Sequence, residues 1–179
     1  LLAATAYDRI EIVAYGEQET TAALREAAGR ARGEYLIFLP EGTGVDREDW
    51  LTVMAANAVR EKIGIVGPKL LGENGHVLSA GMAIGLRATA GSLFVGNDRD
   101  SVGYFSRTII QQEIGAVAFA GMMTEKRLYE ELGGLNESYG INEAALEFCL
   151  KVRKRGKEVL FTPFVSLELA DDRFAPQQV

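Results

Sequence analysis

The chain has 179 residues, of which 47% are hydrophobic and 25% are charged, a composition typical of one soluble globular domain with its own core. Nineteen Lys and Arg against 25 Asp and Glu give a net charge of −6, which argues against a general attraction for nucleic acid or anionic lipid. One cysteine and one histidine exclude an internal disulfide and leave too few ligands for a zinc site or a Cys–His catalytic pair.

The absence of a disulfide predicts a reducing compartment, so the expected location is cytoplasmic. No apolar run reaches the length that spans a membrane, and the opening "LLAATA" lacks the basic flank of a signal peptide.

The first third of the chain alternates apolar strands with helical patterns. The sequence predicts strands at 10–14, 35–39 and 63–66 and helices at 20–31 and 46–59, the second helix capped by Asp46 and the last strand stopped by Gly67-Pro68. This β-α-β-α-β order predicts a mostly parallel sheet with right-handed crossovers. The continuously apolar stretch 35–39 is typical of an inner strand covered on both faces.

The rest of the chain has a different rhythm. Glu73-Asn74-Gly75 between two apolar pairs predicts a hairpin, and His76 after it is expected to have only an edge-strand role. Beyond it we expect long loops over 85–112, a strand at 116–123, helices at 125–132 and 143–155, and a strand at 159–162. Residues 1–170 are expected to form a single domain and 171–179 a tail or linker.

Spacing alone indicates little chemistry. Glu143, Glu147 and Lys151 follow one another at intervals of four residues along one helix face, which favours a solvated stripe with a Glu147–Lys151 pair over a catalytic role. Cys149 lies on the apolar side of the same helix and is expected to be a small buried residue. No glycine-rich nucleotide fingerprint occurs at a strand-to-helix turn. The residues by themselves therefore indicate a soluble α/β domain and no more.

Two stretches of the chain are nonetheless familiar. "ARGEYLIFL", "DWL" and "IGIVGPKLL" resemble the nucleotide-binding half of family 2 glycosyltransferases, and "VGYFSRTIIQQEIGAVAFAGMMTEKRLYEELGGLNE" with "FCLKVRKRGKEVLFTPFVSLEL" resembles the acceptor half of one subgroup. The similarity runs from Tyr7 to about Leu169. It implies the α/β GT-A fold, a mostly parallel sheet flanked by helices, and a function connected with nucleotide sugars.

The resemblance also implies a metal site that this chain lacks. In the family, an acidic triplet after the strand ending at Leu39 holds Mg²⁺ or Mn²⁺ on the sugar diphosphate, because hard cations take oxygen ligands. Here Pro40, Glu41 and Gly42 occupy the triplet, and the metal-binding carboxylate falls on Gly42. We therefore expect no metal cofactor in this chain.

Other family positions are also replaced. The pair that contains the general base falls on Ala144 and Ala145, with Glu147 at a later acidic position, and the aspartate that contacts uracil falls on Tyr15. Histidines typical of the subgroup fall on Ser79, Ser92 and the region 169–170. The segment after Gly16 is shorter than usual, and the chain starts after the family's first strand and helix, so the sheet is expected to be truncated at its N-terminal side.

These replacements favour a catalytically degenerate domain that serves as a structural, glycan-binding or partner-binding module of a larger protein. The alternative is an active, metal-independent transferase in which Glu143 or Glu147 is the base and loop arginines hold the diphosphate, the loop arginines being Arg87, Arg99 and Arg107. A self-associating interaction protein is a third class. The residues selected as substrate-binding candidates are Glu41, Thr43, Glu143 and Glu147. The expected partners are a glycan or nucleotide sugar, a second copy, or further domains of the parent protein, and not nucleic acid.

Overall fold

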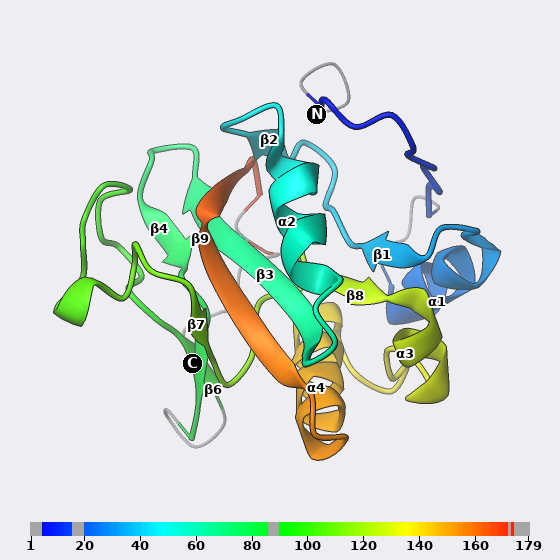
Figure 1. Cartoon of the computed structure of the whole chain (residues 1–179). Coiled ribbons are helices and arrows are strands. Elements are labelled where there is room, and N and C mark those ends of the chain that lie inside the picture. Colours follow the sequence, from blue (N-terminus) through cyan, green and yellow to red (C-terminus); the bar gives the residue numbers. More distant parts are fainter. Residues whose placement is uncertain (1–4, 16–19, 86–89, 172, 174–179) are drawn as a thin grey trace.

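The structure is a computed structural model that describes residues 5–15, 20–85, 90–171 and 173. At its centre lie two long strands, β3 (Ile63–Gly72) and β9 (Glu158–Leu169), which pair in parallel along their whole length (Figure 1). Their ladder runs from the pair Ile63–Glu158 to the pair Gly72–Leu169. Because both strands are apolar over most of their length, they can be covered on both faces.

Shorter strands extend the sheet on each side of this pair. The order across the sheet is β1 (Tyr35–Ile37), β8 (Met123–Glu125), β3, β9 and β2 (Gly44–Val45). The second half of β3 also pairs with β4 (Val77–Ser79), and the first half of β9 with β7 (Gln112–Glu113). A separate hairpin consists of β5 (Met82–Ile84) and β6 (Ala90–Ser92).

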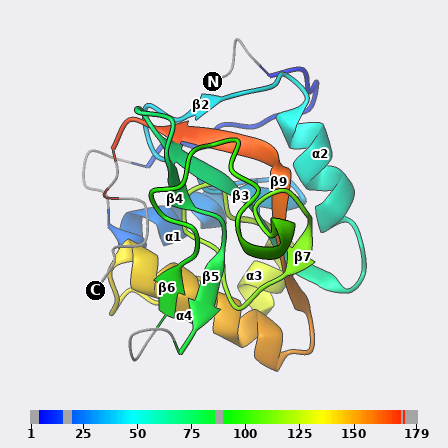
Figure 2. The same ribbon diagram turned by 90° about the vertical axis from the view of Figure 1, so that its left-hand side faces the viewer.

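Helices cover both faces of the sheet. Helix α2 (Trp50–Ala58) packs on β3 and β9 from one side, and α4 (Ile141–Lys154) packs on the same strands from the other (Figure 2). Helix α1 (Thr21–Arg30) begins at Thr20, whose hydroxyl accepts a hydrogen bond from the Ala23 N–H, and α3 (Lys126–Glu131) follows β8 directly. One short 3₁₀ turn spans Tyr104–Ser106.

The core is continuous between these layers. Its largest fully buried side chains include Trp50, Phe119, Phe148 and Phe161, contributed by both helices, the segment before β8, and β9. The inward residues expected on α2, which are Trp50, Leu51, Met54 and Ala58, are all buried. The predicted mixed α/β sheet flanked by helices is thereby confirmed.

The expected direction of the strands was wrong. Among the described strands, β3 and β9 form the only parallel pair, and the sheet is mixed. β1 and β3 do run in the same direction, but β8 lies between them and is antiparallel to both. A strand was expected at 116–123, but the structure has only β8 there, which begins at Met123. Residues 117–122 form a buried irregular segment that leads into β8.

The segment 10–14 is not a strand in this structure. It is held to the rest of the chain by arginines at the end of α1 and just after it: Arg32 donates to the Glu11 carboxylate and the Arg30 guanidinium donates to the Ala14 carbonyl. As a result, β1 is an edge strand of the described sheet, although its apolar sequence suggested an inner one.

Two strands are longer than their prolines suggested. β3 continues through Gly67-Pro68, and β9 continues through Pro163. Their registers shift together at this point, from the pair Pro68–Thr162 to the pair Lys69–Ser166, which is an irregularity that accommodates residues unable to donate to the ladder.

Helix α2 also begins later than expected. Its N-cap residue is Asp49, and the Asp46 carboxylate accepts a hydrogen bond from the Ser166 N–H of β9 instead. Within the described residues, no helix is long and apolar enough to cross a membrane.

Gly64→Ala tests how tightly α4 approaches the central pair. A Cβ at Gly64 would lie 2.4 Å from Val152 Cγ1 and 3.0 Å from Lys157 Cβ, so the helix would have to shift. We expect a loss of about 1–3 kcal/mol in the free energy of unfolding, measured by urea denaturation. The control is Gly29→Ala in α1, where nothing lies within 4 Å and a gain of about 0.5–1 kcal/mol is expected. Equal effects of the two changes would contradict the packing described.

Cys149 provides a second test, because burial raises the pKa of its thiol from 9.0 to about 12. The native thiol should therefore resist a thiol-specific reagent at pH 8 and react with one equivalent once the chain is unfolded. Since the unfolded state loses this proton at lower pH than the folded state, stability should fall as pH rises from about 9 to about 12. Rapid labelling of the folded protein would show that Cys149 is accessible.

Candidate functional site

The resemblance places the site at the carboxyl end of the central strands, and the structure shows what lies there. The loop that follows β1 returns as β2, which pairs with the last residues of β9 through Gly44–Glu168 and Val45–Leu167. The loop 40–43 is therefore held against the segment 168–170 by backbone hydrogen bonds.

Gly42 and Ala170 face each other across this junction. Gly42 adopts a left-handed conformation with φ of +75°, and a Cβ built on it would lie 3.2 Å from the Ala170 Cβ. The resemblance puts a metal-binding carboxylate at Gly42 and a histidine in the region 169–170. Gly42 has no side chain and Ala170 has only a methyl group, so neither side chain can supply a metal ligand. Within the described ranges, no cluster of three or more His, Cys, Asp or Glu side chains could hold a metal ion.

The two candidate residues on this loop have different environments. Glu41 is exposed at the loop's outer side. Thr43 is buried, and its hydroxyl donates to the Pro40 carbonyl at 2.7 Å. Thr43 thus braces the turn, whereas Glu41 is free to meet a ligand from solvent.

The other candidate residues lie on α4. At the positions that the resemblance gives to the base pair, Ala144 and Ala145 are both buried in the core. Glu143 is exposed in the first turn. Glu147 is half-buried and pairs with Lys151 at 2.9 Å, as its spacing predicted. The second carboxylate oxygen of Glu147 is enclosed and has no hydrogen-bond partner among the described residues.

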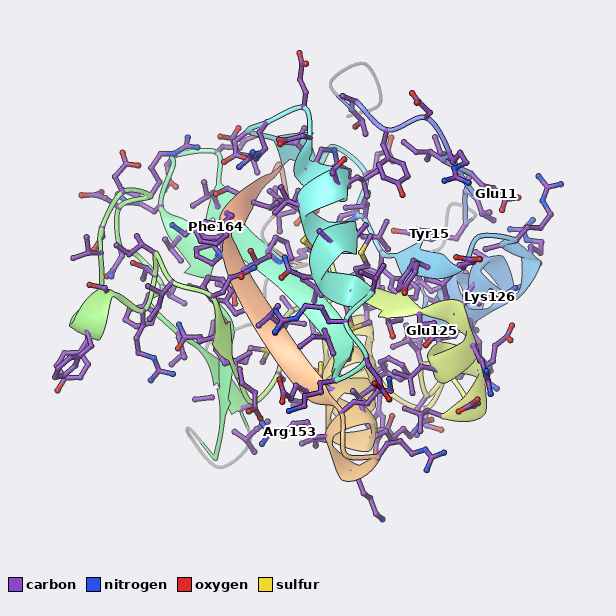
Figure 3. All side chains as sticks on the ribbon, in the orientation of Figure 1. Glu11, Tyr15, Glu125, Lys126, Arg153 and Phe164 are labelled. Carbon is purple, nitrogen blue, oxygen red and sulfur yellow. The ribbon has the colours of Figure 1, made fainter. Side chains whose placement is uncertain are left out.

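The remaining family positions, Ser79, Ser92 and Tyr15, are buried or partly buried in this chain. Ser79 and Ser92 are buried side by side, with a hydrogen bond of 3.2 Å between their hydroxyls. Tyr15 is partly buried against the core, and it lies next to Ala14, whose carbonyl is bound by Arg30 near the end of α1 (Figure 3).

A charged cluster beside the loop was not anticipated from the sequence. The buried amine of Lys69 on β3 donates to the Arg99 carbonyl at 3.1 Å, and the Arg99 guanidinium pairs with Glu168 at 3.2 Å. Burial lowers the pKa of Lys69, while the carboxylates of Asp100 and Asp46 oppose that shift. The only signal in the sequence was a lysine inside the apolar run "IGIVGPKLL".

The loop arginines considered for a diphosphate are dispersed. Arg99 lies near the loop 40–43, because its ion-pair partner Glu168 lies against Gly44, the residue that follows this loop. Arg107 donates instead to Gln112 at 2.6 Å, next to β7, and Arg87 lies outside the described residues.

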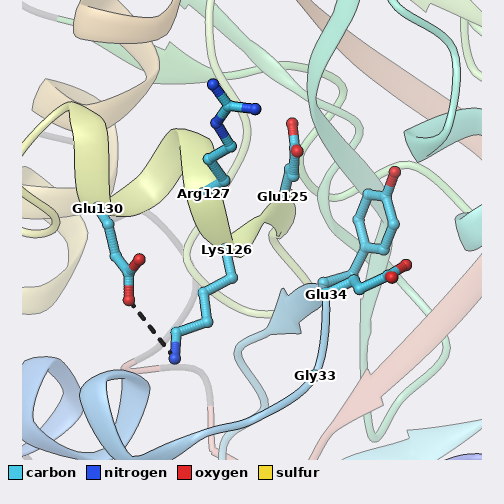
Figure 4. A pocket seen from close by; sticks show the side chains of 7 residues that line it. Gly33, Glu34, Glu125, Lys126, Arg127 and Glu130 are labelled. Atoms are coloured by element: carbon cyan, nitrogen blue, oxygen red, sulfur yellow. Dashed lines mark ion pairs between the residues drawn. The ribbon is translucent and has the colours of Figure 1, made fainter.

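A hollow of about 470 Å³ lies at the opposite end of β1 (Figure 4). Its walls carry charges of both signs, and Lys126 pairs there with Glu130 at 3.4 Å. Burial, followed by the carboxylates of Glu125 and Glu34, raises the pKa of the Tyr35 phenol. Because this hollow adjoins the start of β1 and the loop 40–43 follows its end, it is not part of the site that the resemblance indicates. Its lining residues are Gly33, Glu34, Tyr35, Glu125, Lys126, Arg127 and Glu130.

Comparison with known proteins gives two relatives in sequence. The chain is 32% identical over 161 residues to the uncharacterized protein y4gI of Sinorhizobium fredii (strain NBRC 101917 / NGR234), covering 89% of this chain and 18% of that protein. It is 30% identical over 137 residues to the O-antigen biosynthesis protein RfbC of Myxococcus xanthus, covering 76% of this chain and 11% of that protein. The chain thus spans less than a fifth of these relatives. No protein-family model matches it.

A solved structure gives the fold. The crystal structure of GalNAc-T7 with UDP, GalNAc and Mn²⁺ superposes with a TM-score of 0.65 and 18% sequence identity, covering 87% of this chain and 31% of that one. The chain therefore has a glycosyltransferase-like α/β fold of the GT-A type.

Glu147→Gln tests the role of the α4 stripe. Because the Glu147–Lys151 pair is partly solvated, its loss should cost only about 0.3–0.5 kcal/mol of unfolding free energy, measured by thermal denaturation. The matched control is Glu131→Gln, which removes the more exposed i, i+4 pair with Arg127. A loss several times larger for Glu147→Gln alone would show that its carboxylate has another task.

Proposed function

We propose that this domain is a degenerate member of the family 2 glycosyltransferases that binds a glycan or a protein partner and does not transfer sugar. The proposal combines the GT-A fold with the chemistry that is missing from the junction of the loop 40–43 and the segment 168–170. In this proposal, the domain is one module of a larger polypeptide.

The observation that carries the proposal is the contact between Gly42 and Ala170. A divalent cation on a sugar diphosphate needs hard oxygen ligands, and it stabilises the charge of the leaving group. A Cβ built on Gly42 would lie only 3.2 Å from the Ala170 Cβ, so a carboxylate side chain at position 42 would need Ala170 to move. Without the cation, no positive metal charge would stabilise the negative charge that develops on the diphosphate as it leaves.

The environment of α4 supports the same interpretation. A general base must reach the acceptor hydroxyl, yet the side chains of Ala144 and Ala145 are directed into the core. Without a base, the acceptor hydroxyl remains a weak nucleophile, at a cost of roughly 10²–10⁴ in rate.

The alternative is a metal-independent transferase, and Arg99 is the feature in its favour. A guanidinium beside the former metal loop could replace the cation in principle. Around it, however, the three carboxylates of Glu168, Asp46 and Asp100 outnumber the two cations of Lys69 and Arg99. This local balance favours repulsion of a diphosphate, because like charges at short range oppose one another.

Two measurements on the whole chain test the proposal. Calorimetric titration with UDP should show no tight binding, and Mn²⁺ should not change the result. A radiolabelled-donor assay with UDP-, GDP- and dTDP-sugars should show neither transfer nor hydrolysis above background.

The variants Glu143→Ala and Glu147→Ala decide the alternative. Turnover that disappears in either variant would establish a displaced base and refute the degenerate interpretation. Turnover that survives both but is lost in Arg99→Met would assign the leaving-group role to the cation beside the loop, and would refute it equally.

A further inference from the structure

A second hollow, of about 300 Å³, is lined by residues on or next to the β5–β6 hairpin, β7 and the end of α4. Figure 2 shows where these elements lie in the fold. Its apolar lining includes Met82, Leu93 and Ile114, and its polar lining consists of Arg107, Glu113 and Arg153. Ligand sites for small molecules commonly combine apolar walls with a few placed polar groups.

This hollow is far from the former catalytic junction. β7 pairs with β9 at Leu160 and Phe161, whereas β2 pairs with β9 at Leu167 and Glu168. On the partner strand β3, the residues opposite these two places are Val66–Gly67 and Leu70–Leu71. They are four residues apart, which corresponds to roughly 13 Å, so the two places lie toward opposite ends of β9. On α4, Arg153 is likewise separated from the former base position, Ala145, by about 12 Å of helix.

Both arginines of the hollow are held in position by the backbone or by a neighbour. Arg153 donates through Nη1 to the Ile114 carbonyl at 3.1 Å. Arg107 donates through Nε to Gln112, whose amide donates back to the Arg107 carbonyl, each at 2.6 Å. A guanidinium carries five N–H donors in a fixed plane, so each arginine keeps further donors for a ligand.

An exposed aromatic pair belongs to the same turn as Arg107. Tyr104 and Phe105 are 74% and 77% exposed, and their rings meet edge to face with centroids 4.4 Å apart. The Arg107 N–H donates to the Tyr104 carbonyl at 3.3 Å, so the pair and Arg107 are joined by one turn of backbone.

The backbone of this turn is strained at two residues. Phe105 and Ser106 have φ of 52° and 58°, a left-handed conformation that is unfavourable for non-glycine residues. The base of the loop resists relaxation, because Thr108 is fully buried and its hydroxyl donates to the Ser101 carbonyl. Such strain is retained where the surroundings enforce it and is common at ligand sites.

We propose that the hollow is a saccharide-binding site, separate from the former transferase junction. The Tyr104–Phe105 pair lies outside the lining of the hollow, is joined to it through the turn that carries Arg107, and extends the site for an oligosaccharide. The inference rests on the proposed glycan-binding function and names the surface that performs it. A sugar ring has an apolar C–H face, which suits an aromatic ring or the Leu93–Ile114 wall, and an oxygen-rich edge, which suits the guanidinium donors. The two positive charges of Arg107 and Arg153 and the negative charge of Glu113 give the hollow a net charge of +1. This net charge favours a sugar that carries a carboxylate.

The charge of the chain argues against other polyanions and surfaces. At a net charge of −6, the protein has no general attraction for nucleic acid or anionic lipid. A sugar carboxylate can still be selected, because paired N–H donors of arginine match its two oxygens.

The test is titration of the whole chain, without nucleotide or metal, by defined oligosaccharides followed by calorimetry. One arm uses neutral hexose oligomers and the other uronic-acid-containing oligomers. We expect saturable binding that is stronger in the uronate arm. Arg107→Met and Arg153→Met should each weaken it by about tenfold or more, since a charge-assisted hydrogen bond is lost. The double variant Tyr104→Ser/Phe105→Ser should weaken it in both arms.

The controls are matched to the variants. Arg127→Met changes an arginine that lines the other hollow, and Phe164→Ala removes a different exposed aromatic ring, on β9. Both should leave binding unchanged, and thermal denaturation of each variant checks that it is folded. Because the aromatic residues are exposed, the double variant remains informative if Arg153→Met fails to fold.

Two results would overturn the inference. One is the absence of saturable binding in both arms, or binding that the hollow variants leave unchanged. The other is concentration-dependent self-association in light scattering that the Tyr104→Ser/Phe105→Ser variant abolishes, because the surface would then serve a second copy. Turnover in the donor assay would refute only the non-catalytic function, so the two failures are distinguishable.

Discussion

The parallel pairing of β3 with β9 is the constraint on which the rest of the structure depends. It joins segments more than 90 residues apart and provides every other layer with its support: β8 and β4 share one edge of the pair, β2 and β7 the other, and α2 and α4 cover its faces. Close approach to this pair demands glycine at Gly64 and Gly67, where a Cβ would collide with Val152 and Val117. Binding features can therefore vary at the ends of the pair while its centre stays closely packed.

The two ends of β9 illustrate this separation of scaffold and chemistry. At the carboxyl end, the loop 40–43 lies beside Ala170, and neither Gly42 nor Ala170 has a side chain that could hold a cation. At the amino end, the turn after the 3₁₀ segment and the end of α4 bring Arg107 and Arg153 to a second hollow. A fold can host a new site in this way, because function depends on side chains placed on the scaffold.

Helices and the turn chemistry were predicted well from sequence, because their signals are local. The Glu73-Asn74-Gly75 hairpin, the inward face of α2 and the Glu147–Lys151 pair all follow from spacing within a few residues. Strand neighbours and strand lengths were predicted poorly. The insertion of β8 between β1 and β3, and the continuation of both long strands past proline, depend on partners that are distant in sequence.

Some features of the candidate site could likewise be predicted from the sequence, and others could not. The sequence by itself determined that positions 42, 144 and 145 lack carboxylates, because the identity of each residue can be read from the sequence directly. Only the tertiary structure decided that Gly42 faces Ala170, that Ala144 and Ala145 are buried, and that Arg107 and Arg153 line one hollow. Contacts between residues 40 to 130 positions apart arise from packing of the whole chain, and no local pattern of residues encodes them.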